Sequence, residues 1–102
     1  YDHCWVLDAG GGELAYAGGL YCPLNGRRVD VYTTETCMQV YTANWARYEQ
    51  TAKGGEHLSF RCAVALETQH APDSPNKPEF PTTVVKAGET YRSTTEFRFG
   101  VK

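Results

Sequence analysis

The clearest alternation of hydrophobic and polar residues runs from His57 to Glu67 and predicts a β-strand. Five apolar side chains fall on one parity of this segment: Leu58, Phe60, Cys62, Val64 and Leu66. Mostly polar residues occupy the other parity, so we expect one buried face and one exposed face. The segment from Tyr91 to Lys102 has a similar pattern and predicts a second strand of the same kind.

A hairpin is predicted around Asn25-Gly26, because a type I′ turn needs a positive φ at both of its central residues. This turn is expected to join a strand at 20–24 to a strand at 28–33. Pro23 cannot donate a hydrogen bond to a neighbouring strand, so the first of these is expected at the edge of its sheet.

Three further segments complete the predicted sheet. Residues 36–42 and 2–7 have the composition of strands, and a glycine-rich turn follows the second of them. Val84-Val85 is expected to form a hairpin with the last strand through the loop 86–89. These short connections favour a mainly antiparallel sheet.

Residues 44–53 break the strand period and predict a short helix, because Trp45, Tyr48 and Ala52 are spaced along one helical face. The predicted fold class is therefore α+β: a mainly antiparallel β-sheet with one short central helix. The alternative is a continuous strand over residues 38–48, which would give an all-β sandwich.

With 102 residues, the chain is expected to form a single β-rich domain over residues 1–102. A core of this size stabilises a fold only modestly, so additional constraints are expected. The chain contains four cysteines, Cys4, Cys22, Cys37 and Cys62, which predict two disulfides whose pairing the spacing leaves open. No C-x-x-C pair is present, and this argues against a metal site.

Disulfides favour an oxidising compartment, so the protein is predicted to be secreted. The chain begins at Tyr1 without methionine, which is typical of a mature form whose signal peptide has been removed. The formal charge of −2 argues against a nucleic-acid partner, because such binding needs an excess of Lys and Arg. No apolar run is long enough for a membrane span, and no motif indicates a cofactor.

The segment at residues 69–82 is rich in proline and is predicted to connect two strands. Its prolines recur at every third position, at Pro72, Pro75, Pro78 and Pro81. This is the period of a polyproline II helix, so the four residues are candidates for an extended docking ridge. The simpler interpretation is a connector in which proline blocks edge pairing.

Exposed aromatic residues are candidates for a binding surface, and Trp5 and Trp45 are the two that would bind a glycan. The titratable candidates for catalysis are His3, His57, His70, Glu56, Glu67 and Arg61. An acid–base site would use Glu56, Arg61 and one of His57 or His70, although the strand period does not bring these residues together locally.

The profile of a small, acidic, tyrosine- and glycine-rich chain with four cysteines resembles that of fungal secreted ribonucleases of the guanyl-specific type, and of host-directed effectors with their fold. The resemblance carries over no catalytic residue. We predict a secreted, disulfide-stabilised binding protein, such as a microbial effector or virulence factor, that acts on a host macromolecule without catalysis. A protein is the expected partner, and a glycan is the alternative. The alternatives are a small hydrolase such as a ribonuclease, and a carbohydrate-binding module.

Overall fold

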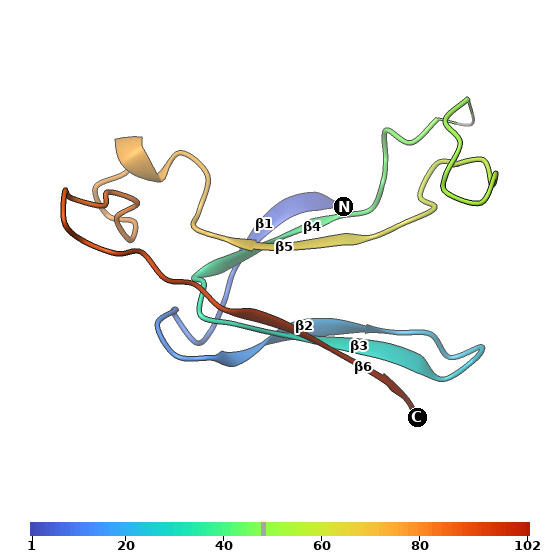
Figure 1. The fold of residues 1–102 in the computed structure, drawn as a ribbon, viewed down its shortest axis with the longest axis horizontal. Helices are drawn as coiled ribbons and strands as arrows, with labels where there is room; N and C mark the ends of the chain where they lie inside the picture. The colour runs from blue at the N-terminus through green and yellow to red at the C-terminus, as the bar shows by residue number, and fades with distance from the viewer. Residues whose placement is uncertain (48) are drawn as a thin grey trace.

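The computed structural model describes residues 1–47 and 49–102, whose strands form two antiparallel three-stranded sheets stacked as layers (Figure 1). The upper layer consists, in spatial order, of β1 (Asp2–Val6), β4 (Cys37–Tyr41) and β5 (Ala65–Gln69). The lower layer consists of β2 (Ala15–Tyr21), β3 (Arg27–Thr33) and β6 (Thr95–Val101). A single 3-10 turn, η1, spans Ser74–Asn76.

The predicted α+β class is wrong, and the all-β alternative fits the structure. The described residues between 44 and 53 form turns and one isolated β-bridge, from Thr51 to His57. Tyr48, which the helix prediction used, lies outside the described residues. The helical spacing did not produce a helix here because the loop is folded on itself, with Leu58 N–H donating to the carbonyl of Gln50 at 2.9 Å.

The strand predicted at 57–67 is also wrong over most of its length, because β5 begins only at Ala65. Arg61 has a φ of 60°, in the left-handed region, which interrupts an extended chain. The N–H of Cys62 donates to the carbonyl of Ser59 at 3.0 Å and closes a turn there. The alternation of apolar and polar residues in 57–64 therefore lies in a loop, and most side chains of this loop are exposed.

The hairpin predicted at Asn25-Gly26 joins β2 to β3, and β2 is the predicted edge strand. Its turn differs from type I′, because a positive φ, 72°, occurs at Gly26 alone of the two residues. A Cβ there would lie 2.7 Å from the carbonyl oxygen of Lys102. The loop 86–89 also turns as expected, but Val84-Val85 forms no strand beside it.

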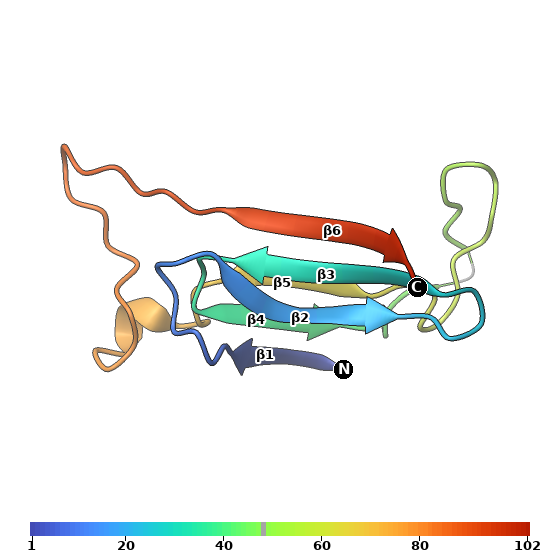
Figure 2. The same cartoon turned by 90° about the horizontal axis from the view of Figure 1, so that it is seen from below.

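The core lies between the two sheets and is small. Its buried apolar side chains are Leu7, Val31 and Met38, with Ala17, Val40 and Leu66 packed around them. The sheets are offset sideways, so that β6 projects past the layer above it (Figure 2). Phe97, Phe99 and Val101 share the side of β6 that continues the inner face, yet they remain 47%, 81% and 77% exposed.

The two predicted disulfides are absent, and all four cysteines are free thiols. Cys4 and Cys37 lie on neighbouring strands, but Cys4 is opposite Gln39 and Cys37 is opposite Val6. This diagonal separation is longer than a directly opposed pair and disfavours a bridge. The secreted location has lost the disulfides on which it rested and stays a prediction.

Three threonine hydroxyls connect the two sheets at one end of the core. The hydroxyl of Thr95 on β6 lies 3.0 Å from that of Thr33 and 2.6 Å from that of Thr68 on β5. Thr33 is 1% exposed and also donates to the carbonyl of Thr94 at 3.2 Å. Of these bonds, the one between Thr95 and Thr68 crosses the layers and holds β5 against the lower sheet.

No helix among the described residues is long and apolar enough to cross a membrane.

We predict that Thr95→Val destabilises the protein by about 1–2 kcal/mol, because it removes the hydroxyl shared by Thr33 and Thr68. Thr95→Ser keeps that hydroxyl and is expected to retain most of the stability. Urea unfolding of both variants checks this, and equal free energies of unfolding would contradict it.

Candidate functional site

The outward face of the β1-β4-β5 sheet gathers polar side chains from all three strands. Because alternate residues of a strand point to opposite faces, Met38 and Val40 of β4 face the core while Gln39 faces outward. The register places Gln39 opposite Cys4 of β1 and opposite Glu67 of β5. One amide and one carboxylate are thereby fixed side by side on the outer surface.

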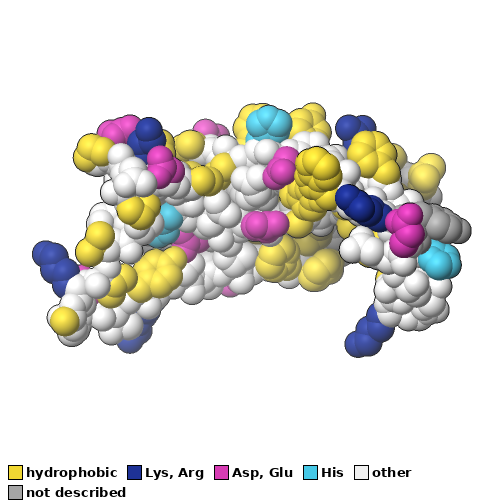
Figure 3. Space-filling view, turned by 90° about the horizontal axis from the view of Figure 1, so that it is seen from above, with side chains coloured by type: hydrophobic (Ala, Val, Ile, Leu, Met, Phe, Trp, Pro, Cys, Tyr) yellow, Lys and Arg dark blue, Asp and Glu magenta, His cyan; other side chains and the backbone are white. Residues whose placement is uncertain are grey.

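A cavity of about 460 Å³ lies over this face. Seven residues line it: Asp2, Gln39, Tyr41, Trp45, Glu67, Gln69 and Pro72. Seen from the side of this sheet, acidic side chains lie beside hydrophobic ones near the middle of the face (Figure 3). We call these seven residues the polar cavity.

An aromatic wall borders the polar cavity at the end of β4. The side chain of Trp45 is 76% exposed, which leaves it free to stack on a ligand. The hydroxyl of Tyr41 accepts a hydrogen bond of 3.0 Å from the backbone N–H of Trp45. This bond fixes the start of the loop that carries the indole.

The two carboxylates of the cavity have different surroundings. Gln39 Nε2 donates to Asp2 Oδ1 at 2.6 Å, so Asp2 is held in one orientation. Glu67 is exposed, and no hydrogen bond or ion pair joins its side-chain carboxylate to another described residue. The carboxylate of Glu67 is therefore available to a ligand.

The thiol of Cys4, opposite Gln39 on β1, accepts a long hydrogen bond of 3.8 Å from Gln69 Nε2. Burial and the neighbouring Cys37 raise the pKa of the Cys4 thiol, so it stays protonated at neutral pH. This favours a packing role for Cys4 over a nucleophilic one.

The composition of the polar cavity suits a neutral ligand with many hydroxyl groups. Carboxylate and amide oxygens accept hydrogen bonds from hydroxyls, amide nitrogens donate to them, and an indole stacks on the apolar side of a ring. A free carboxylate can also accept a proton in general base catalysis. The described residues contain no cluster of three or more His, Cys, Asp or Glu placed to hold a metal ion.

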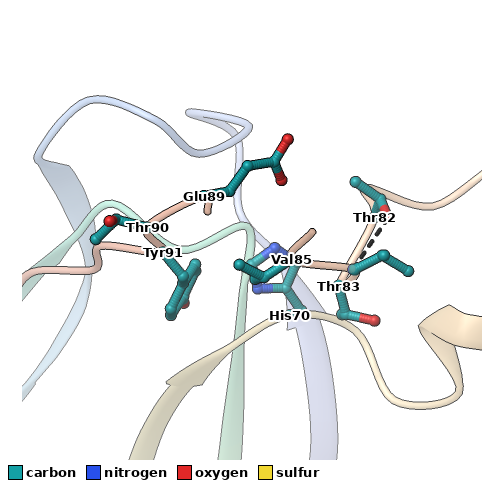
Figure 4. Close-up of a pocket in the computed structure, with 8 residues that line it drawn as sticks. His70, Thr82, Thr83, Val85, Glu89, Thr90 and Tyr91 are labelled. Atoms are coloured by element: carbon teal, nitrogen blue, oxygen red, sulfur yellow. Dashed lines mark hydrogen bonds between the residues drawn. The ribbon is translucent and has the colours of Figure 1, made fainter. Parts of the chain in front are cut away.

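A second cavity, of about 450 Å³, lies beyond the end of β5, where His70 and Tyr91 face segment 82–90 (Figure 4). Behind it lies Glu35, which is 5% exposed and whose Oε2 makes no well-aligned hydrogen bond to a described residue. His70 Nδ1 lies 2.9 Å from Glu35 Oε2, and the hydroxyl of Tyr91 donates to Oε1. Burial acts to raise the pKa of Glu35, but interactions with Ser93, Tyr91 and His70 outweigh it and leave the pKa below its usual value.

The catalytic residues proposed from the sequence are not brought together. Glu56, His57 and Arg61 belong to the loop between β4 and β5, whereas His70 lies at the second cavity. The guanidinium of Arg61 stacks 4.7 Å from the ring of Phe60, and its Nε lies 3.4 Å from Asn44 Oδ1. None of the four lines the polar cavity.

The proposed binding residues divide between the two faces of the upper sheet. Trp45 and Pro72 line the polar cavity, whereas Trp5 lines a cleft between the sheets. The predicted polyproline II ridge is interrupted, because Asp73 has a φ of 62° and η1 follows it. Pro75, Pro78 and Pro81 line neither cavity and stay predictions as binding residues.

Sequence reasoning missed Asp2 and Gln39 and did not select Glu67 from the titratable candidates. These residues are far apart in the chain and meet only through strand pairing. A signal was present in the sequence, since each is a polar residue inside a segment that predicts a strand.

Comparison with known proteins gives this chain a family context. The family model described as aldose 1-epimerase matches residues 1–98. Galactose mutarotases from Mus musculus and Homo sapiens are 40% and 35% identical to it over 99% of this chain. Aldose 1-epimerase from Escherichia coli is 34% identical over 97% of this chain. The chain spans 29% of the length of each of these relatives.

These similarities overturn the functional hypothesis drawn from the sequence. The matching proteins are named as sugar-converting enzymes, so the non-catalytic effector is wrong, and nothing supports virulence. The ribonuclease resemblance also finds no support. A carbohydrate substrate fits the glycan predicted as the alternative partner, whereas the predicted protein partner is unsupported. The single domain over residues 1–102 stays a prediction.

We predict that Glu35→Gln makes stability less sensitive to acid. The folded pKa of Glu35 lies below the ordinary glutamate value of about 4.3. Its ionisation therefore stabilises the fold above that pH, and this contribution is lost as the pH falls through the folded pKa. Urea unfolding from pH 7 to about pH 3 should show a steeper loss for the wild type than for Glu35→Gln. Glu13→Gln, in an exposed loop, is the control, and equal slopes for all three proteins would contradict the prediction.

Proposed function

Because this chain belongs to the aldose 1-epimerase family, we propose that its polar cavity binds an aldose and that Glu67 exchanges a proton with the C1 hydroxyl of the sugar. The chain spans 29% of its relatives' length, so we propose that it contributes part of a complete active site. The observation that carries the proposal is the unpartnered, exposed carboxylate of Glu67 in a cavity lined by amides and an indole.

Epimerisation at C1 requires the sugar ring to open and to close again. A base removes the proton from the C1 hydroxyl, a C1=O double bond forms, and the bond from C1 to the ring oxygen breaks. An acid gives a proton to that ring oxygen, so charge and atoms balance. Rotation about the bond from C1 to C2 and reversal of both proton transfers then gives the other anomer.

Of the two carboxylates in the cavity, Glu67 is the better base. Asp2 already accepts a hydrogen bond of 2.6 Å from Gln39, which occupies one of its carboxylate oxygens and holds it in place. Glu67 has no such bond to the described residues and can approach a hydroxyl proton directly. Asp2 is therefore assigned to binding and Glu67 to proton transfer.

The remaining groups orient the sugar. Gln39 lies directly across the strand pair from Glu67, so a hydroxyl bound by its amide lies beside the base. Gln69 is two residues further along β5 on the same face and offers a second amide. The exposed indole of Trp45 supplies a stacking surface for the ring carbons.

The acid that serves the ring oxygen is expected from another part of the active site. The described residues lining the polar cavity include no histidine and no lysine. Asp2 already accepts a hydrogen bond from Gln39 and is assigned to binding, so it does not serve as this acid. We therefore assign the acid to a region corresponding to the part of the relatives that this chain does not span.

Glu67→Gln is expected to lower kcat for mutarotation by about 10²- to 10⁴-fold, because the amide cannot accept the hydroxyl proton. Polarimetry of freshly dissolved α-D-galactose with the full-length protein measures the rate. Glu13→Gln is the control for loss of a surface charge. Activity of Glu67→Gln within a factor of a few of the wild type would exclude Glu67 as the base.

The two tryptophans are expected to respond differently to sugar. Galactose should change the fluorescence of Trp45, which lines the polar cavity, and leave that of Trp5 unchanged. Titration of Trp45→Phe should therefore lose the signal, whereas Trp5→Phe should keep it. A signal that persists in Trp45→Phe would contradict the assignment of the indole to the sugar site.

A further inference from the structure

The proposed base lies on a strand with limited support. β5 is an edge strand whose only hydrogen-bonded neighbour in the described structure is β4. The two strands are not joined by a short hairpin, since residues 42–64 connect them at one end. At the other end, the backbone pairing of β4 with β5 stops at the pair Cys37 and Gln69. An edge strand without a tight turn is prone to fraying at such an end.

A buried polar contact lies at this end. Glu35 precedes β4 by two residues and His70 follows β5 directly, and their side chains meet at 2.9 Å. The contact thus links the segments that lie just outside the last backbone pair of β4 and β5. The hydroxyl of Tyr91 donates to the other oxygen of Glu35 and holds the carboxylate in this orientation.

We propose that Glu35 and His70 form a clamp that positions the catalytic strand, with His70 as a positioning residue for Glu67. The clamp fixes the end of β5, and with it Gln69 and Pro72, which line the polar cavity on either side of His70. His70 itself lines the second cavity (Figure 4) and is not among the residues that line the polar cavity. The catalytic part of this proposal rests on the proposed function of Glu67.

The threonine bonds leave the chain beyond Thr68 without comparable support. Thr68 is the residue after Glu67 and is bonded to Thr95 at 2.6 Å, so β5 is held from its inner face at this residue. Beyond Thr68, the described side-chain contact of β5 is a long one, of 3.8 Å from Gln69 Nε2 to Cys4 Sγ. His70 then makes the next contact, at 2.9 Å from the carboxylate of Glu35, which is 5% exposed.

The test compares His70→Ala with His70→Asn in the full-length protein. The alanine variant loses the clamp, whereas the amide nitrogen of asparagine can occupy the position of Nδ1 beside Glu35. We expect kcat for mutarotation of α-D-galactose to fall about 10- to 100-fold in His70→Ala, with KM changed by less than about threefold. His70→Asn should recover most of kcat. Glu89→Gln, which removes an acid from the same cavity without touching the clamp, should match the wild type.

Hydrogen exchange, followed by mass spectrometry of peptides, supplies a readout independent of catalysis. Peptides covering Ala65–Gln69 should exchange faster in His70→Ala, and those covering β3 and β6 should be unchanged. Unchanged exchange in β5, or an unchanged kcat, would overturn the clamp. So would failure of His70→Asn to recover kcat while its β5 exchange is normal.

Two further outcomes are separable. If His70→Ala unfolds, Tyr91→Phe replaces it, because that variant loosens Glu35 while keeping the imidazole, and the same two readouts decide. If the wild type does not catalyse mutarotation, the proposed function fails alone, and the exchange of β5 still decides whether the clamp holds this strand.

Discussion

The register of β4 between β1 and β5 determines both the core and the candidate site. Met38 and Val40 point inward and complete the apolar layer, while Gln39 points outward between the strands that carry Asp2 and Glu67. A slip of one residue would bury the amide and expose the apolar side chains. Packing and function therefore select the same register, because the residues that stabilise it alternate with those that bind.

This dependence explains why so small a core is sufficient to define the site. Few residues are fully buried, and the offset of the sheets leaves much of the inner face of β6 exposed. The geometry of the cavity is determined instead by backbone pairing, which fixes the positions of Gln39 and Glu67 relative to each other. The exposed apolar side chains of β6 contribute nothing to that arrangement.

The sequence predicted those parts of the fold where local signals agree with the final environment. Strands at 2–7 and 36–42 and the hairpin at Asn25-Gly26 followed from alternation and turn chemistry, and β1, β4 and the β2-β3 hairpin confirm them. The strand at 57–67 failed because alternation cannot reveal the left-handed conformation of Arg61. The two disulfides failed because cysteine number says nothing of register. The residues of the candidate site were not selected from the sequence for a related reason: pairing across three strands, which no spacing in the sequence encodes, brings them together.

Polar contacts take the part that a larger hydrophobic core would otherwise take around β5. An edge strand buries only one face and one row of hydrogen-bonding groups, so its position is weakly defined by apolar packing. Thr68 is bonded to Thr95 across the layers, and His70 meets a buried Glu35 at the end of the strand. Such contacts depend on distance and direction, and movement of the strand would separate the paired groups. A displaced Glu67 would therefore cost the energy of these bonds, whereas sliding over a small apolar surface would cost little. The polar network limits the positions available to the carboxylate more strongly than the core does.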